Sequence, residues 1–245
     1  MIGRLHSVET FGAVDGPGIR TVFFMQGCPA RCLYCHNPDT WDVCGGQETG
    51  LDEIVHRAVR GRPYYGKDGG VTFSGGEPLM QGRFVLSAMR RLKEQGIKSV
   101  IDTSGTYIDD YTEDIVKEAQ LILLDIKHSE SGEFERISGC GQEHLFEIIA
   151  LAKKHSVPLW VRQVIVPGIN DSEKNIENLA AFIKKYIGDD LYRAELLGYH
   201  TMGANKYKKL GMKYRLDGVA QMNGERLEQL SRKLTQSLDL QRSKA

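Results

Sequence analysis

Three cysteines stand close together between Gly27 and Asn37, and they are the residues best suited to chemistry. Three residues separate Cys28 from Cys32 and two separate Cys32 from Cys35, so a compact loop can direct all three thiols at one centre. A structural zinc site needs four ligands, and an iron–sulfur cluster held by cysteines normally takes four as well. The three thiols therefore predict a metal centre that keeps one coordination position open for chemistry.

Other interpretations of these cysteines stay open at this point. The thiols could be buried and inert, could form a disulfide with one thiol left over, or could form a zinc site completed by His36 or Cys44. A disulfide needs an oxidising compartment. The chain has five cysteines and no apolar signal region at its amino terminus, which predicts the cytoplasm, where thiols stay reduced.

The composition argues against several classes of protein. The chain has 245 residues, of which 41% are hydrophobic, and this suits one domain over 1–245 with a sizeable core. Lys+Arg and Asp+Glu number 32 each, a balance that argues against a generally basic surface for nucleic acid. No run approaches the roughly 18 apolar residues that cross a bilayer. We therefore expect neither a nucleic-acid nor a membrane partner.

Strand and helix patterns alternate along most of the chain. Each strand pattern is short and rich in apolar or β-branched residues, and the strands are predicted over 19–26, 70–73, 98–101, 121–124, 159–166 and 193–197. Helices with apolar residues three and four apart follow them. This alternation predicts the α/β class with a parallel sheet and right-handed crossovers. Six units are fewer than the eight of a closed barrel, so we expect an open, partial (β/α)6 barrel similar to a TIM barrel.

The remaining segments show weaker sequence patterns. Residues 4–18 are polar and Gly-rich, with a turn predicted over 15–18, and the connection over 201–222 is predicted to be long and irregular. Asn170 and Glu173 are expected to cap the helix that follows the fifth strand. The last helix is predicted over about 223–240.

Polar residues gather where the predicted strands end. The first strand runs into the cysteine loop over 27–37, and the later strands end at Gly75-Gly76-Glu77, Asp102, Asp125, Lys127 and His200. Taken singly, these residues could form a turn, helix caps, a rim ion pair and a structural histidine. The carboxyl ends of parallel strands line one face, so we expect them to share one site. Two carboxylates, a lysine, a histidine and backbone amides suit a zwitterionic ligand with hydroxyls.

The cysteine spacing, with the aromatic Tyr34 before Cys35, resembles the signature of the radical S-adenosylmethionine (SAM) enzymes. The resemblance implies that Cys28, Cys32 and Cys35 hold three irons of one [4Fe-4S] cluster, and that SAM chelates the fourth iron. The Gly75-Gly76-Glu77 segment is similar to a second signature of the family, which meets the methionine amine.

The segment Asp15-Gly16-Pro17-Gly18-Ile19-Arg20 resembles the signature of glycyl-radical-enzyme activases. Further segments fall in the order typical of the pyruvate formate-lyase type, at 102–105, 125–127, 160–168 and 197–200. The chain lacks the insertion with two more cysteine clusters that related activases carry, so Cys44 and Cys140 are interpreted as non-ligands. Gly198 stands where the pattern has proline, which could loosen the placement of His200.

The resemblance implies an enzyme that activates pyruvate formate-lyase under anaerobic conditions. The reduced cluster would cleave SAM to methionine and a 5′-deoxyadenosyl radical, which would take a hydrogen from a glycine Cα of the partner. Flavodoxin or ferredoxin would supply the electron, and the chain would act as a monomer. The alternatives are the same chemistry on another glycyl radical enzyme, and a zinc-binding interaction module.

The resemblance also implies roles for individual residues. The SAM-binding set would be Tyr34, Cys35, His36, Gly75, Gly76, Glu77, Asp102, Thr103, Asp125, Ile126, Lys127 and His200. Within this set, Tyr34, Cys35 and His36 of the cysteine loop would flank the adenine, and residues 75–77 would hold the amine of SAM. A monovalent cation shared with the SAM carboxylate would lie at Asp102, Thr103 and Asp125. Asp15 and Arg162 would contact the glycyl loop of the partner.

Overall fold

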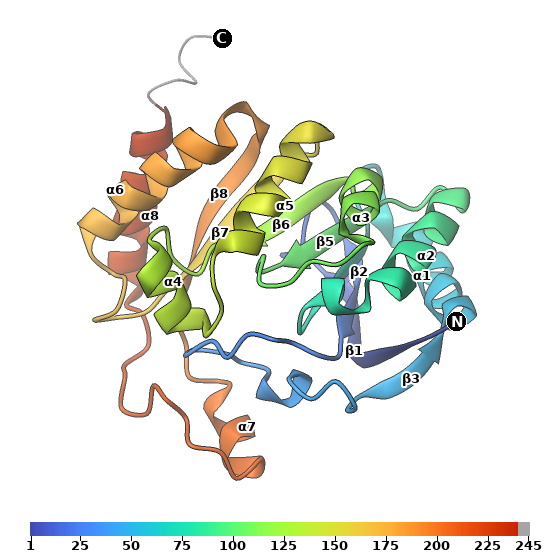
Figure 1. Ribbon diagram of the computed structural model, residues 1–245, viewed down its shortest axis with the longest axis horizontal. Helices are drawn as coiled ribbons and strands as arrows, with labels where there is room; N and C mark the ends of the chain where they lie inside the picture. Colours follow the sequence, from blue (N-terminus) through green and yellow to red (C-terminus); the bar gives the residue numbers. More distant parts are fainter. Residues whose placement is uncertain (240–245) are drawn as a thin grey trace.

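Six parallel strands form the centre of the molecule (Figure 1). The computed structural model describes residues 1–239. In chain order the six strands are β2 (Arg20–Met25), β4 (Gly70–Gly75), β5 (Ser99–Thr103), β6 (Leu121–Asp125), β7 (Leu159–Ile165) and β8 (Leu191–Gly198). They lie side by side in that order, and the sheet ends at β8 on one side without closing. The predicted α/β class with six parallel strands in an open arrangement is therefore confirmed.

Helices cover the outer face of this sheet (Figure 1). They are α1 (Leu51–Tyr65), α2 (Gly82–Glu94), α3 (Thr112–Glu118), α5 (Glu143–Lys154), α6 (Glu173–Phe182) and α8 (Gly224–Asp239). In α2 the apolar stripe is buried, with Val85, Ala88 and Leu92 fully covered. Both faces of the strands are thus apolar, as in β6, where Leu121 to Leu124 are all buried. Among the residues described, no helix combines the length and apolar character that crossing a membrane requires.

The amino-terminal segment is more regular than predicted. Residues Ile2–Gly12 form β1, which pairs antiparallel with β2 on one side and with β3 (Gln47–Gly50) on the other. The sequence patterns predicted no strand in this segment, and β1 ends before the turn that was predicted over 15–18. In β1 Leu5 is buried but most neighbouring side chains are exposed, because the strand lies near the edge of the sheet. Because so few of its side chains are buried, the sequence of β1 is polar.

Two short helices and one cap also differ from the prediction. The helices α4 (Ser131–Ser138) and α7 (Ala204–Lys209) were not expected, and α7 lies within the supposedly irregular 201–222. Ser172 caps α6, because its hydroxyl accepts a hydrogen bond from the amide of Asn175 at 3.1 Å. Asn170 instead holds the turn after β7, accepting from the amide of Val166 at 2.7 Å. Residue 240, the last of the predicted final helix, lies outside the described residues.

Short helical turns complete the chain. These are η1 (Pro38–Thr40), η2 (Pro78–Gln81), the π-helical η3 (Ile183–Ile187) and η4 (Gly188–Asp190). The turn η2 joins β4 to α2, and η3 continues α6 without a break. Only η1 and η2 lie next to segments that carry predicted site residues.

A fully buried arginine holds the segment before β2 against β4. The Arg20 guanidinium donates through Nε to Thr72 Oγ1 and through Nη2 to the carbonyl of Val71, both at 2.6 Å. Thr72 Oγ1 in turn donates to the carbonyl of Asp15 at 2.6 Å. Burial lowers the pKa of Arg20 to about 10, so the side chain stays charged at neutral pH and needs these acceptors. The network therefore places Asp15 relative to the strands.

Replacing Thr72 with Val should test this network, because Val keeps the shape but removes the bridging hydroxyl. We expect a loss of about 1–3 kcal/mol in the free energy of unfolding, since the Asp15 carbonyl is left without its donor. Urea denaturation of the anaerobic protein measures it. The control Thr235→Val removes an exposed hydroxyl that bonds only within α8, and should change stability by less than about 0.5 kcal/mol. Equal effects of the two substitutions would contradict the assignment.

Candidate functional site

A cavity of about 350 Å³ lies at the carboxyl ends of the parallel strands. The predicted site residues that line it are Asp15, Cys28, Cys32, Tyr34, Cys35, His36, Gly75, Gly76, Asp102, Thr103, Asp125, Lys127 and Arg162. The wall also contains residues that the sequence did not single out, namely Phe24, Ala30, Asn37, Thr40, Ser74, Ser104, Val164 and Leu197. Glu77, Ile126 and His200 are absent from this described lining. The strand ends thus converge on one site, as their pattern predicts.

Backbone contacts fix the cysteine loop between β2 and α4. The loop starts at Gly27, whose φ of +94° favours glycine and whose amide donates to the carbonyl of Thr40 at 2.8 Å. Further along, the amide of Leu33 donates to the carbonyl of Ile137 at 2.9 Å. Cys32 is buried, whereas Cys28 and Cys35 are partly exposed towards the cavity. The helix α4 was not expected from sequence, yet it supports this loop.

All five cysteines are free thiols in the structure. Cys44 is exposed and Cys140 is half-buried, and neither lines the described cavity. Within residues 1–239, no three side chains of His, Cys, Asp or Glu are grouped closely enough to hold a single metal ion.

The donor set around the cavity fits an iron–sulfur cluster. Burial raises the pKa of Cys28, Cys32 and Cys35, so these thiols ionise only beside positive charge, which bound iron supplies. At Cys32 the charges of Lys127 and Arg215 oppose the effect of burial and favour the thiolate. Soft thiolate ligands suit iron–sulfur clusters.

Two glycines let the end of β4 approach the cysteine loop. A Cβ on Gly76 would lie 2.2 Å from the carbonyl oxygen of Gly27 and 3.3 Å from Cys28 Cβ. Gly75 has a φ of +105°, and its added Cβ would lie 2.3 Å from the amide of Met25. Any larger residue at either position would push β4 away from Cys28. The cradle therefore depends on the glycines themselves.

Glu77 lies behind the cavity wall rather than in it. Its fully buried carboxylate accepts hydrogen bonds from Thr103 Oγ1 at 2.8 Å and from the hydroxyl and amide of Ser104 at 2.9 and 3.1 Å. The amide of Leu79 adds a fourth bond at 3.3 Å. These bonds join the end of β4 to the end of β5. The contact between Glu77 and the methionine amine stays a prediction, and Ser104, which follows Thr103 in sequence, is a supporting residue that the sequence analysis missed.

Ile126 is also buried away from the cavity. Its amide donates to the carbonyl of Arg162 at 2.9 Å, and its carbonyl accepts from Gln163 Nε2 at 3.3 Å. These bonds tie β6 to β7 just below Lys127. The predicted role of Ile126 in SAM binding stays a prediction.

Two ion pairs cross the floor of the cavity. Arg162 Nη2 donates to Asp102 Oδ1 at 2.6 Å, and Ser74 Oγ donates to Asp102 Oδ2 at 2.6 Å. Lys127 Nζ donates to Asp125 Oδ2 at 2.7 Å. Burial alone would lower the pKa of Lys127, but the Asp125 carboxylate outweighs burial and raises it well above its usual value. The Asp125 carboxylate has a lowered pKa beside Lys127, so this pair is ionised at neutral pH.

Several buried polar atoms around the cavity lack a partner among the described residues. They are Asp125 Oδ1, Arg162 Nε, Tyr34 Oη and His200 Nδ1. Buried polar groups are nearly always hydrogen-bonded in native proteins, so unpartnered atoms at a cavity indicate where a polar ligand binds. A carboxylate oxygen, a guanidinium N–H and a phenol together suit a ligand that has both donors and acceptors.

Asp15 reaches the same charged group from the segment before β2. Burial and the nearby Asp102 carboxylate raise the pKa of Asp15 and Arg162 opposes them, so that this pKa is about 6. Asp15 and Arg162 both line the cavity, as expected for residues that would meet the same partner segment.

His36 and His200 stack on each other beside the cavity. Their ring centroids lie 3.9 Å apart at an interplanar angle of 24°, and His36 Nε2 donates to the carbonyl of His200 at 2.9 Å. Gly203 permits this contact, because an added Cβ there would lie 2.7 Å from His36 Cα. Gly198 packs close to α8, where an added Cβ would lie 3.1 Å from Leu227 Cδ2. His200 therefore sits against the cysteine loop.

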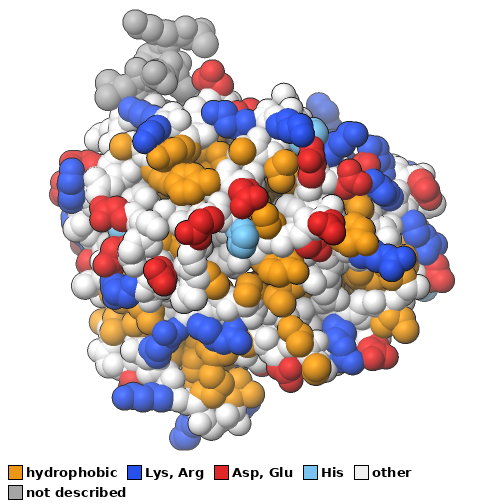
Figure 2. Space-filling model, in the orientation of Figure 1, with side chains coloured by type: hydrophobic (Ala, Val, Ile, Leu, Met, Phe, Trp, Pro, Cys, Tyr) orange, Lys and Arg blue, Asp and Glu red, His pale blue; other side chains and the backbone are white. Residues whose placement is uncertain are grey.

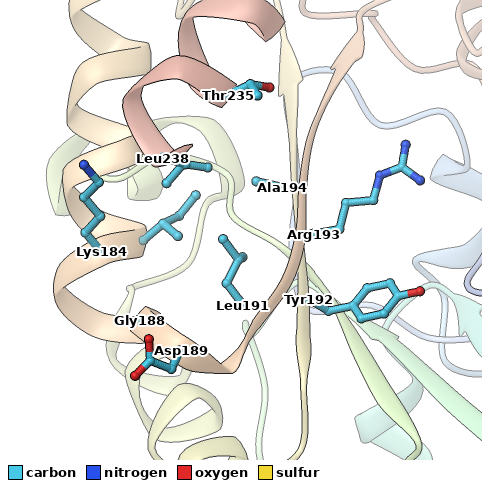
Figure 3. Close-up of a pocket in the computed structure, with 10 residues that line it drawn as sticks. Lys184, Gly188, Asp189, Leu191, Tyr192, Arg193, Ala194, Thr235 and Leu238 are labelled. Carbon is cyan, nitrogen blue, oxygen red and sulfur yellow. The ribbon is translucent and has the colours of Figure 1, made fainter. Parts of the chain in front are cut away.

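A second hollow, of about 310 Å³, lies at the other end of β8 (Figure 3). Its wall combines Leu191 to Ala194 of β8 with Lys184, Asp189 and Thr235. In the part of the chain that the structure describes, it contains none of the predicted site residues. The chemistry predicted from sequence therefore belongs to the first cavity.

Comparisons with known proteins agree with this geometry. The sequence profile of the Radical SAM superfamily matches residues 22–180. The chain is 44% identical over 240 residues to a pyruvate formate-lyase-activating enzyme of Clostridium pasteurianum, covering 98% of this chain and all of that one. A relative of the same name from Staphylococcus epidermidis is 39% identical over 238 residues and 94% of each chain.

Solved structures show the same fold. A domain of a pyruvate-formate lyase-activating enzyme from Bacteroides vulgatus superposes with a TM-score of 0.56 at 25% identity, covering 69% of this chain and 94% of that one. Streptococcus suis SuiB, bound to its precursor peptide SuiA, superposes with a TM-score of 0.67 over 91% of this chain and 46% of its own. At 15% identity the second likeness concerns the fold alone.

The Glu77 carboxylate should leave a signature in the pH dependence of stability. Burial raises its pKa from 4.5 to about 7, so between these values the folded state keeps a proton that the unfolded state has lost. Below the unfolded-state pKa the protonated Glu77 contributes its full share to the free energy of unfolding. This free energy falls as pH rises through about 7, by up to roughly 3 kcal/mol. Glu77→Gln should remove this slope, as measured by urea denaturation from pH 4 to 8. Glu94→Gln, at an exposed position, should retain it, and an unchanged slope in Glu77→Gln would refute the assignment.

Proposed function

The chain belongs to the radical SAM superfamily and, within it, to the family of the pyruvate formate-lyase-activating enzymes, and we propose that it activates pyruvate formate-lyase under anaerobic conditions. One observation carries the proposal. Cys28, Cys32 and Cys35 line the same cavity as the ion pairs of Asp102 and Asp125. Because the chain belongs to this family, the alternative that it is a zinc-binding interaction module is rejected.

The chemistry itself comes from the cofactors. When bound, one reduced [4Fe-4S] cluster cleaves S-adenosylmethionine to methionine and a 5′-deoxyadenosyl radical, which takes a hydrogen atom from a glycine Cα of the protein substrate. In our proposal Cys28, Cys32 and Cys35 hold the cluster, and the chain's other residues bind, orient and shield. Gly75 and Gly76 bring the backbone of β4 next to Cys28, where it can meet the amine of SAM.

The charged residues orient SAM in this proposal. Asp125 Oδ1 and Arg162 Nε, which have no partner among the described residues, face a ligand of mixed charge. Asp102, Thr103 and Asp125 supply oxygens for a monovalent cation beside the SAM carboxylate, because hard cations prefer oxygen ligands. Tyr34, His36 and His200 flank the adenosine, and Lys127 lies over the Tyr34 ring at 5.6 Å.

The protein substrate is a glycyl radical enzyme. Its glycine loop enters the cavity beside Asp15 and Arg162, which lie where the open sheet leaves room for an extended peptide. We infer that a flavodoxin or ferredoxin supplies the electron, that the chain acts as a monomer, and that it works in the reducing cytoplasm. The five free cysteines support the last point.

Loss of one cluster ligand should abolish activation without unfolding the chain. Cys32→Ala, reconstituted anaerobically with iron and sulfide, should fail to bind a full cluster and to cleave SAM. Electron paramagnetic resonance of pyruvate formate-lyase after incubation should show a glycyl radical with the wild type and none with Cys32→Ala. The control Cys44→Ala changes an exposed cysteine outside the cavity and should behave as the wild type. Radical formation on a different glycyl radical enzyme alone would replace the proposed partner.

Asp15 should affect the binding of the partner more than the rate of chemistry. Asp15→Asn should raise the KM for pyruvate formate-lyase at least about tenfold, because a hydrogen bond to a charged group contributes about 1.5–3 kcal/mol. The pKa of about 6 also predicts that the wild-type KM falls as pH rises through 6, whereas Asn has no such dependence. Initial rates of radical formation measure both. Asp110→Asn, at an exposed loop position, serves as control, and an unchanged KM in Asp15→Asn would exclude this role.

A further inference from the structure

The connection after β8 carries an unusual concentration of positive charge. Between Ala204 and Leu216 the chain has no acidic residue but five basic ones, Lys206, Lys208, Lys209, Lys213 and Arg215, although acidic and basic residues balance at 32 each overall. Lys208, Lys209 and Lys213 are exposed. In the described part of the chain they form no ion pair, whereas Lys93, Lys154 and Lys233 of the outer helices do.

Exposed apolar side chains lie among these lysines. Met202 is 75% exposed, Leu210 46% and Met212 39%. We call Met202, Lys208, Lys209, Leu210, Met212 and Lys213 the α7 surface. Figure 2 shows Lys and Arg side chains around an apolar patch at the end of the molecule where α7 projects. An apolar centre with a charged rim is typical of a surface that binds another protein.

The helix α7 is firmly attached to the cysteine loop. Lys206 Nζ donates to Asn37 Oδ1 at 2.8 Å and to Asp39 Oδ1 at 3.0 Å. The buried Tyr207 packs edge-on against Trp41, with ring centroids 5.8 Å apart. Trp41 and Cys35 both pack against the buried apolar cluster that contains Tyr207. These contacts attach the α7 surface to the cysteine loop and to the segment that follows it.

The α7 surface lies outside the cavity that binds the substrates. The described lining of the cavity includes Cys35, His36 and Asn37 but neither Trp41 nor any residue of α7. The cysteine loop therefore contacts the cavity on one side and α7 on the other. An electron carrier on α7 would leave the cavity free for SAM and for the glycine loop.

We propose that the α7 surface is the docking site of an acidic one-electron carrier protein that reduces the cluster. The inference rests on the proposed function, because only a bound cluster needs an electron. The carrier is oxidised by one electron, the cluster is reduced by one, and no bond is made or broken. Positive charge on α7 attracts the acidic carrier, and the bond from Lys206 to Asn37 and the packing of Tyr207 on Trp41 hold this surface next to the cysteine loop.

Charge reversal on α7 tests the proposal in the anaerobic holoenzyme. The double variant K208E/K209E should be reduced by a photoreduced, acidic flavodoxin at least about tenfold more slowly than the wild type at low salt. The difference should shrink at about 0.5 M salt, where charges are screened. Stopped-flow absorbance of the cluster measures the rate. Lys206 and Arg215 are left unchanged, because Lys206 anchors α7 and Arg215 acts on Cys32.

Two controls separate docking from damage to the cluster. K174E/K184E makes the same charge change on α6 and η3, and should be reduced by flavodoxin at the wild-type rate. An uncharged small reductant, photoreduced deazariboflavin, should reduce the wild type and both variants equally. In addition, a basic carrier such as cytochrome c should oxidise the reduced cluster of K208E/K209E faster than that of the wild type, which a merely structural role of these lysines would not produce.

Three results would overturn the proposal. One is an unchanged rate of cluster reduction by flavodoxin in K208E/K209E. Another is that deazariboflavin reduces this variant more slowly than the wild type by the same factor as flavodoxin does. The third is a lower yield of glycyl radical under deazariboflavin reduction, which would assign the α7 surface to the protein substrate. A failure of the proposed function would give a different result. In that case no partner would gain a glycyl radical, but K208E/K209E would still slow the reduction of the cluster by flavodoxin.

Discussion

Ionised groups buried at the strand ends must be balanced by opposite charge, and the site depends on this constraint. Asp102 pairs with Arg162 and Asp125 pairs with Lys127, so two acids and two bases share one cavity at neutral pH. Each pair leaves one polar atom without a described partner. A cavity with unpartnered atoms that donate and accept can bind the zwitterionic amino-acid end of SAM without a large desolvation cost.

A second set of bonds holds these groups in place without facing the cavity. The carboxylate of Glu77 connects the ends of β4 and β5, and the guanidinium of Arg20 connects the segment before β2 with β4. Both side chains are fully buried and both bond to neighbours that bear or adjoin site residues. The positions of Asp15 and Thr103 therefore depend on two buried side chains that are not part of the described lining of the cavity.

The cysteine loop connects two surfaces that serve different partners. Most of its residues line the cavity, and its last residue, Asn37, accepts a hydrogen bond from Lys206 of α7. His36 and His200 close the same loop against the end of β8. Because one short loop carries all of these contacts, a cluster held there lies between the site of SAM and the basic surface, which separates the delivery of the electron from its use.

Local sequence determined the elements and the type of chemistry, whereas contacts between distant residues decided how the site is built. The cysteine spacing and the buried run of β6 are patterns within a few residues, and the family and the strand that they predict are confirmed. The strand β1 was missed because it lies next to the edge strand β3 and buries few side chains, and the cap of α6 was misplaced because Asn170 bonds to Val166 instead. The stacking of His36 on His200 and the partners of Glu77 join residues far apart in the chain, and periodicity carries no information about which loops meet once the sheet is formed.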